Sequence, residues 1–261
     1  MSVSDKHETD SNSNTRATIM KTLVFVHGYL GGSQQWIAQA EAFSKHFQVI
    51  TPDLPGFGLN NEAQAPESIN GFARYIIDEL DRSGVENFHL VGHSMGGMIV
   101  QEIIALVPER VDKLILYGTG PVGLLPGRFE TLDESRRRVE ADGVEATGRR
   151  ISATWFQHGE VARGYQSCAD ITSMAHLQAA LAGLTAMEGW SGVASLTKIK
   201  SHTLVLWGDG DRAYQWAQPE MLWRKISNVN LAVVPGCSHA VHLEKPKLFN
   251  AILQDFLVSS N

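Results

Sequence analysis

The stretch LVGHSMGGMIV, residues 90–100, places a serine between two glycines, where an apolar run meets a helix-like run. Ser94 stands between Gly92 and Gly96 in the spacing G-x-S-x-G. A tight strand-to-helix turn crowds the neighbouring side chains, so small residues are needed on either side of it. The turn lifts the serine hydroxyl clear of the backbone, at a helix N-terminus that favours negative charge. On their own, these residues fit either an exposed nucleophile or a glycine-rich turn with a capping serine.

Apolar runs alternate with helical patterns on both sides of this stretch. The apolar runs are continuous, which is typical of parallel strands covered on both faces. In the segments between these runs, apolar residues recur with the period of a helix. Ile69, Phe72 and Ile76, for example, would share one helix face. Repeated strand–helix units predict an α/β fold with a doubly wound, mostly parallel sheet. The predicted strands are residues 22–28, 48–53, 87–93, 112–119, 202–208 and 230–236, and the predicted helices are 33–47, 68–84, 95–106 and a last segment with Leu248, Ile252 and Phe256.

One long interval departs from this alternation of strands and helices. Residues 121–200 contain no convincing strand and are rich in large apolar side chains. We therefore predict a helical cap insertion there, with residues 19–120 and 201–261 forming the α/β core. Residues 1–18 are polar and lack the apolar centre of a secretory signal, so they are interpreted as a disordered tail.

Composition excludes several classes of function. The 261 residues fit one large domain or one domain with a sizeable insertion, and the net charge of −6 argues against binding to nucleic acid. No run approaches the roughly 18 apolar residues of a membrane span. Two cysteines make no disulfide framework, which favours a cytoplasmic location. Nothing resembles a metal-ligand cluster or a phosphate loop, so neither a metal nor a cofactor is expected.

A serine nucleophile needs a base, and the base needs an acid that orients it. His239 is the predicted base, because it follows the sixth predicted strand at the carboxyl edge of the sheet, where ligands bind. His242 is the rival, closer to the last helix. Asp211 and Asp209 both follow the fifth predicted strand, in WGDGDR. Asp211 is preferred because the longer loop can reach the histidine, whereas Asp209 is interpreted as a turn-former.

An oxyanion that forms on a substrate needs two hydrogen-bond donors. The backbone N–H of Met95, the first after the serine, is the predicted first donor. The second is predicted in the loop HGYLGGS after the first strand, whose glycines allow close approach to a ligand. Tyr29 is the preferred donor there, with Leu30 as the second choice.

Five motifs together resemble those of the α/β-hydrolase fold superfamily: VFVHGYLGG, TPDLPGFG, LVGHSMGGM, LVLWGDGDR and VPGCSHAVHLEKP, in this order. The resemblance spans roughly residues 23–257 and is far more specific for the fold than for a substrate. It implies that Ser94, Asp211 and His239 are nucleophile, acid and base, and that the insertion caps the site. Members often begin with a β-hairpin, whereas here only about twenty mostly polar residues precede the first predicted strand.

Large side chains of the insertion and of the loop after the acid are candidates for an apolar acyl pocket, although aromatic residues more often belong to a core. A basic run, Arg136–Arg138, is interpreted as a solvated helix face, with a carboxylate clamp as the alternative. The candidate substrate-binding residues are Leu30, Trp155, Met187, Trp190 and Trp216.

The sequence therefore predicts a cofactor-independent serine hydrolase that cleaves a small carboxylic ester or related acyl compound through an acyl-enzyme, with water as the second substrate. One alternative is a hydrolase of carbon–carbon bonds in diketo or dienone acids. The oxyanion loops of those enzymes usually carry a G-P-G motif, which HGYLGG lacks. A second alternative is a ligand receptor on the same fold. The oligomeric state is left open.

Overall fold

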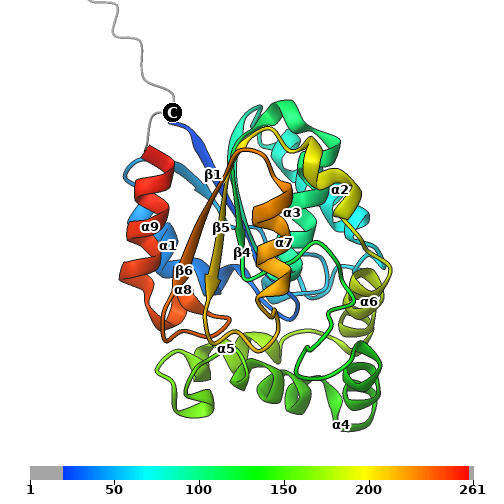
Figure 1. Ribbon diagram of the computed structural model, residues 1–261. Helices are drawn as coiled ribbons and strands as arrows, with labels where there is room; N and C mark the ends of the chain where they lie inside the picture. The colour runs from blue at the N-terminus through cyan, green and yellow to red at the C-terminus, as the bar shows by residue number, and fades with distance from the viewer. Residues whose placement is uncertain (1–19, 259–261) are drawn as a thin grey trace, which may run out of the picture.

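A computed structural model describes residues 20–258 of the chain. Six strands form one sheet in the order β2-β1-β3-β4-β5-β6, and every neighbouring pair is parallel. Helices cover both faces of this sheet (Figure 1). The predicted α/β fold with a doubly wound, parallel sheet is confirmed. The tail predicted for residues 1–18 lies outside the described residues.

Helices and strands alternate along most of the chain, as the apolar pattern predicts. The strands are β1 (Thr22–Val26), β2 (Gln48–Ile50), β3 (Phe88–His93), β4 (Val111–Tyr117), β5 (His202–Gly208) and β6 (Val229–Val234). The α-helices are α1 (Ile37–Phe43), α2 (Ile69–Arg82), α3 (Met95–Leu106), α4 (Leu132–Ala153), α5 (Tyr165–Thr172), α6 (Leu177–Glu188), α7 (Ala217–Lys225), α8 (Val241–Glu244) and α9 (Pro246–Val258). Short 3-10 helices are η1 (Ser33–Trp36), η2 (Gly58–Asn60), η3 (Pro108–Arg110), η4 (Gly159–Val161) and η5 (Val193–Lys198).

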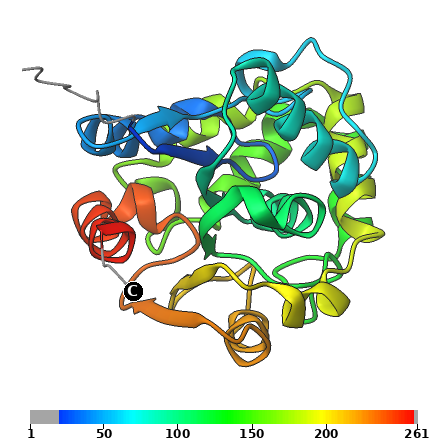
Figure 2. The same cartoon turned by 90° about the horizontal axis from the view of Figure 1, so that it is seen from above.

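The sheet is buried between two apolar layers, which explains why its strands read as continuous apolar runs. Along β1, Val24 and Val26 belong to the layer that α2 and α3 cover, whereas Leu23 and Phe25 belong to the layer of α1 and α9. Side chains of a strand alternate between faces, so burial on both faces requires an apolar residue at each position. Figure 2 shows the two helical layers on either side of the sheet.

The helix predicted for residues 33–47 is shorter than expected. The structure has η1 followed by α1, which ends at Phe43. Trp36 and Phe43 are buried as the pattern predicts, but Gln39 is also fully buried, while Ile37 is 57% exposed. The Gln39 amide donates to the carbonyl oxygen of His242 at 3.2 Å. A polar side chain with a buried partner therefore occupies the inner face, which an apolar pattern cannot indicate.

Three helices, α4 to α6, come between β4 and β5 and lie across the carboxyl end of the sheet (Figure 1). At the base of this segment, an isolated antiparallel bridge pairs Val122 with Ser191. Backbone hydrogen bonds from Gly123 to Trp190 (3.1 Å) and from Gly192 to Pro121 (2.8 Å) flank the bridge. The two ends of the segment therefore leave the core side by side. Within residues 20–258, no helix has both the length and the apolar character needed to cross a membrane.

Candidate active site

The turn between β3 and α3 holds Ser94 in a strained backbone conformation. Its φ is 58° and its ψ is −122°, a backbone conformation that residues other than glycine rarely adopt. A Cβ on Gly92 would collide with the carbonyl oxygen of Gly96, and a Cβ on Gly96 would collide with the carbonyl oxygens of Val26 and His27. Both glycines are therefore required by the close packing of strand, turn and helix, as the spacing predicts.

His239 and Asp211 form a buried pair beside this turn. The Nδ1 atom of His239 lies 2.8 Å from Oδ2 of Asp211, and the two residues are 2% and 5% exposed. The other carboxylate oxygen accepts the backbone N–H groups of Ala213 (2.7 Å) and Tyr214 (3.0 Å). Because a carboxylate accepts, the bonded Nδ1 carries the proton and the Nε2 atom of His239 is left as an acceptor.

The two rival residues lie elsewhere. Asp209 is exposed, and its Oδ1 accepts a backbone N–H from the turn after β6 at 2.7 Å. His242 is buried, with its ring 4.4 Å from that of Trp36 and its Nδ1 3.0 Å from the Tyr117 hydroxyl. Burial, and then the nearby His239, lowers the pKa of His242 to about 3. A histidine with so low a pKa is a weak proton acceptor at neutral pH.

The loop after β1 lies directly against the serine. A Cβ on Gly28 would fall 2.8 Å from the Cβ of Ser94. Among the described residues, the backbone N–H groups of Tyr29 and Met95 have no hydrogen-bond acceptor. Leu30 has a φ of 55° and is buried. Two free donors therefore lie on the two loops that meet at the serine, where an oxyanion would need them.

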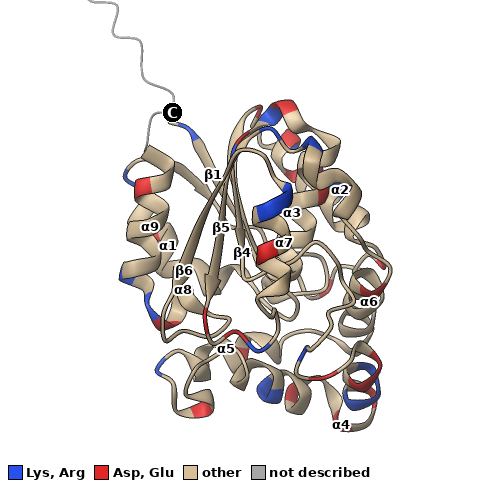
Figure 3. Cartoon of the chain, viewed as in Figure 1, with Lys and Arg blue, Asp and Glu red and all other residues tan. Residues whose placement is uncertain are grey.

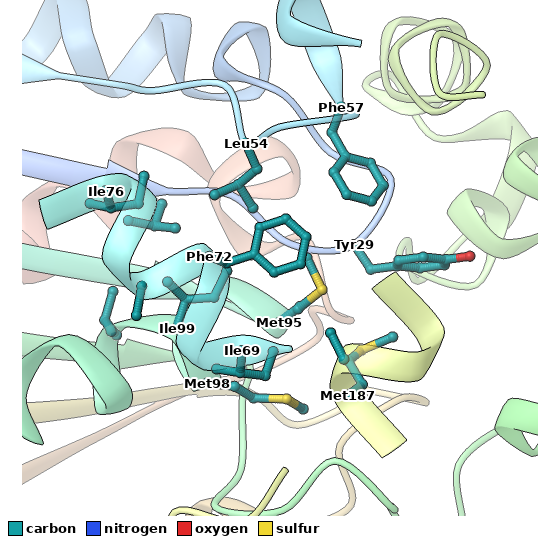
Figure 4. Close-up of a cluster of buried hydrophobic side chains, with 14 of the residues drawn as sticks. Tyr29, Leu54, Phe57, Ile69, Phe72, Ile76, Met95, Met98, Ile99 and Met187 are labelled. Atoms are coloured by element: carbon teal, nitrogen blue, oxygen red, sulfur yellow. The ribbon is translucent and has the colours of Figure 1, made fainter. Parts of the chain in front are cut away.

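His27 holds this loop in place. Its Nε2 accepts the backbone N–H of Leu54 at 3.0 Å, so its Nδ1 carries the proton and donates to the carbonyl oxygen of Gly28 at 2.9 Å. The buried side chain of Met95 lies in the apolar core, close to Phe72 (Figure 4). Tyr29 extends its ring toward α6, where its hydroxyl donates to the carbonyl oxygen of Ala180 at 3.1 Å.

A cavity of about 30 Å³ lies between the core and the segment of α4 to α6. Its lining includes Ser94 and His239 from the core, Tyr29 from the loop after β1, and Trp155 and Met187 from the overlying segment. A volume of this size holds only one or two water molecules. The cavity as described is therefore too small to hold a substrate.

Three other candidate substrate-binding residues do not line this cavity. Leu30 is buried in the core. Trp190 packs against α3, where its indole N–H donates to Glu102 at 3.2 Å. Trp216 is 37% exposed and lies against the ring of Trp207, with 5.5 Å between centroids.

Tyr214 and Arg128 also line the cavity. The sequence pattern did not indicate that their polar groups would lie there. The ring of Tyr214 stacks on that of His239, with 5.5 Å between centroids, and Tyr214 lines the cavity together with Ser94. Burial raises the pKa of Tyr214 to about 12, so this hydroxyl is neutral at physiological pH. Arg128 lies in a turn without periodic context, and no local signal marks it.

A metal site is not part of this arrangement. Among the described residues, no group of three or more histidine, cysteine, aspartate or glutamate side chains could hold a metal ion. Both cysteines, Cys168 and Cys237, are buried and unpaired. Burial raises the pKa of the Cys168 thiol to about 12 and that of Cys237 to about 11. Neither thiol is a reactive nucleophile at neutral pH.

The fold and this site together define a class of protein. The sheet order reverses beside β1, and the serine turn and the glycine loop meet where the strand order reverses. The model of the alpha/beta hydrolase fold family matches residues 21–246. The chain belongs to this family.

Three relatives illustrate its range. A 2-hydroxy-6-oxo-6-phenylhexa-2,4-dienoate hydrolase of Burkholderia cepacia is 28% identical over 226 residues, covering 82% of this chain and 78% of that protein. Monoacylglycerol lipase ABHD6 of Homo sapiens is 24% identical over 260 residues, covering 91% and 75%. The crystal structure of the enol-lactonase from Burkholderia xenovorans LB400 shares the fold, with a TM-score of 0.85, 21% identity and 94% coverage of both chains. This chain is a hydrolase of the same family.

Proposed function

We propose that the protein is a serine hydrolase that needs no cofactor and cleaves a small carboxylic ester or related acyl compound. One observation carries the proposal. Ser94, on its strained turn, lines the same cavity as His239, whose Nδ1 is held by the buried carboxylate of Asp211. A serine, a histidine with a free Nε2 and an orienting acid are the groups that nucleophilic acyl transfer requires.

The first half of the reaction forms an acyl-enzyme. His239 takes the proton from the Ser94 hydroxyl through Nε2 while the serine oxygen attacks the substrate carbonyl carbon. Asp211 keeps the imidazole in the required tautomer and stabilises its positive charge. The negative charge that develops on the carbonyl oxygen is bound by the free N–H groups of Tyr29 and Met95. His239 then gives its proton to the leaving alcohol.

The second half of the reaction uses water. His239 takes a proton from a water molecule, which attacks the acyl carbon, and the same histidine returns the proton to the serine oxygen as the acid leaves. Two buried, unpaired cysteines are compatible with a reducing cytoplasm, where we place the enzyme. Its partners are then the small acyl substrate and water.

The experiment that tests this function is the trapping of the acyl-enzyme. Excess 4-nitrophenyl acetate, quenched with acid within the first turnover, is expected to leave one acetyl group on the peptide that contains Ser94. Mass spectrometry detects the adduct, and a burst of 4-nitrophenolate should accompany it. An acetyl group on another residue, or turnover without any adduct, would contradict the proposed nucleophile. Stoichiometric release that never becomes catalytic would instead support the receptor alternative.

A second candidate function is hydrolysis of a carbon–carbon bond in a diketo or dienone acid. The relative from Burkholderia cepacia, a dienoate hydrolase by name, favours it. A dienone acid belongs in the same substrate panel as the aryl esters. If its kcat/KM exceeded that of every ester, the ester function would be replaced by this one.

We further propose that residues 121–200 act as the cap that selects the substrate. Trp155 and Met187 line the cavity from this segment, whereas Trp190 does not. Changing Trp155 or Met187 to Ala is expected to shift the ratio of kcat/KM between butyryl and acetyl aryl esters by about tenfold, because contacts with single methylene groups have this size. Trp190→Ala is the matched control and should lower thermal stability while the ratio stays the same. Equal losses on all esters in the first two variants would mean that these side chains only support the fold.

A further inference from the structure

Arg128 lines the cavity that holds Ser94 and His239, yet it has no acidic partner. Its Nη1 donates to the carbonyl oxygen of Glu130 at 2.8 Å and to the Ser135 hydroxyl at 3.1 Å. None of the ion pairs among residues 20–258 includes Arg128. A guanidinium stays protonated in proteins, so the cavity wall carries a positive charge that forms no ion pair with any described residue.

The nearest carboxylate is already bound by other residues. The side chain of Glu130 is 7% exposed and accepts from Arg150 at 2.6 and 3.3 Å, while Arg138 lies 3.6 Å away. The Ser135 hydroxyl donates to the same carboxylate at 2.5 Å. One buried acid thus pairs with two other arginines, and it reaches Arg128 only through the Ser135 hydroxyl. Burial lowers the pKa of Arg128, and the nearby Tyr214 and Glu130 oppose this shift without cancelling it.

The basic run Arg136–Arg138, the carboxylate clamp considered from the sequence, is different. Arg136 pairs with Asp133 and Glu188, and Arg137 and Arg138 pair with Glu134. None of the three lines the cavity. Figure 3 shows basic and acidic residues interleaved on α4. Arg136–Arg138 therefore form a solvated helix face rather than a carboxylate clamp.

The free edge of Arg128 has the geometry of a carboxylate receptor. Its two hydrogen bonds both use Nη1, so Nε and Nη2 donate to none of the described residues. These two nitrogens form the side-on edge of the guanidinium, whose parallel N–H groups match the two oxygens of a carboxylate. The face of the guanidinium is also occupied, since its carbon lies 4.5 Å from the centroid of the Phe129 ring. Contacts with the loop thus hold the side chain, while this edge has no partner among the described residues.

We infer that Arg128 binds a carboxylate carried by the substrate, so that the preferred substrates are acyl compounds with a negative charge on the part held in the cavity. The inference rests on the proposed function of Ser94, because it places the carboxylate in the cavity of that serine. Binding the anion gives the partly buried charge of Arg128 a counter-ion, and the cavity must widen to admit the substrate because its described volume holds only water.

The test compares two esters that differ only at the end of the acyl chain. Mono-4-nitrophenyl glutarate ends in a carboxylate, and 4-nitrophenyl valerate ends in a methyl group. We expect the native enzyme to prefer the charged ester by about tenfold or more in kcat/KM. Arg128→Met should lower the ratio of the two kcat/KM values by about 10- to 100-fold, the effect of one hydrogen-bonded charge pair. Arg128→Lys should recover part of the ratio, since it keeps the charge without the two-pronged edge.

Arg136→Met is the matched control, because it removes an arginine of the same segment that is already paired with exposed acids. The ratio of the kcat/KM values of the two esters should be the same for Arg136→Met as for the native enzyme. If the native enzyme hydrolyses both esters with equal kcat/KM, or if Arg128→Met leaves the ratio unchanged, the assignment of Arg128 is wrong while the proposed function stands.

A binding measurement separates this result from a failure of the proposed function. Calorimetry with monomethyl glutarate on the Ser94→Ala protein requires no turnover. In the Ser94→Ala background, Arg128→Met should weaken the binding of monomethyl glutarate by tenfold or more relative to Arg136→Met. This result supports the carboxylate site even if neither aryl ester is hydrolysed. No detectable binding of monomethyl glutarate at millimolar concentration, or equal binding by both variants, overturns it.

Discussion

Ser94→Ala is expected to lower kcat on 4-nitrophenyl butyrate by about four to six orders of magnitude while the protein stays folded. Removing the nucleophile of a serine hydrolase leaves only the contribution of the oxyanion donors and of substrate binding. The loss of stability should be small, because the side chain is only partly buried and its removal takes away one hydroxyl group. Steady-state kinetics and a thermal melt of the same preparation measure both quantities.

Ser173→Ala provides the control for this prediction. Ser173 is also partly buried, and its hydroxyl donates to the carbonyl oxygen of Ala169 at 2.8 Å, away from the cavity. Its kcat should stay within about threefold of the native value. A Ser94→Ala protein that retains activity within tenfold of the native enzyme would exclude Ser94 as the nucleophile.

Asp211→Asn is expected to lower kcat by about four orders of magnitude, whereas Asp209→Asn should lower it by less than about tenfold. The carboxylate of Asp211 accepts a hydrogen bond from the protonated Nδ1 of His239. An amide nitrogen in that place would donate instead, so the imidazole would keep its proton on Nε2 and could not accept the proton of Ser94. Among the described residues, the Asp209 carboxylate accepts a hydrogen bond only from the backbone N–H of Gly236, and an amide oxygen can replace it there.

The two aspartate variants form a matched pair, because both change a carboxylate to an amide in the same loop. Kinetics with one aryl ester, together with melting temperatures, separates lost chemistry from lost stability. The hydrogen bonds that Asp211 accepts from Ala213 and Tyr214 can persist with an amide oxygen, so Asp211→Asn should remain folded. If Asp209→Asn were the slower enzyme, the acid would be assigned to the wrong residue.

The sequence by itself determined the parallel sheet and the local form of the serine turn. Burial on both faces requires continuous apolar strands, and this composition is visible in each run separately. The collisions that exclude a Cβ at Gly92 and Gly96 arise within a few residues of the turn or from the neighbouring strand, so the spacing alone indicates the turn. The preference for Asp211 over Asp209 followed from loop length, and the structure places only the former against His239. Such features depend on neighbours in sequence or on the common edge of a parallel sheet.

Tertiary structure decided which side chains reach the cavity. Trp155 and Trp190 are both large aromatic residues of the same segment, yet only Trp155 lines it, because Trp190 is held by Glu102, 88 residues earlier in the chain. Arg128 lies in a turn without any pattern, and its lack of an acidic partner depends on Glu130 being bound to arginines of α4. Residues that are distant in sequence set the lining of a cavity and the balance of its charges. Local periodicity carries no information about such contacts, and they appear only when the helices above the sheet are packed against it.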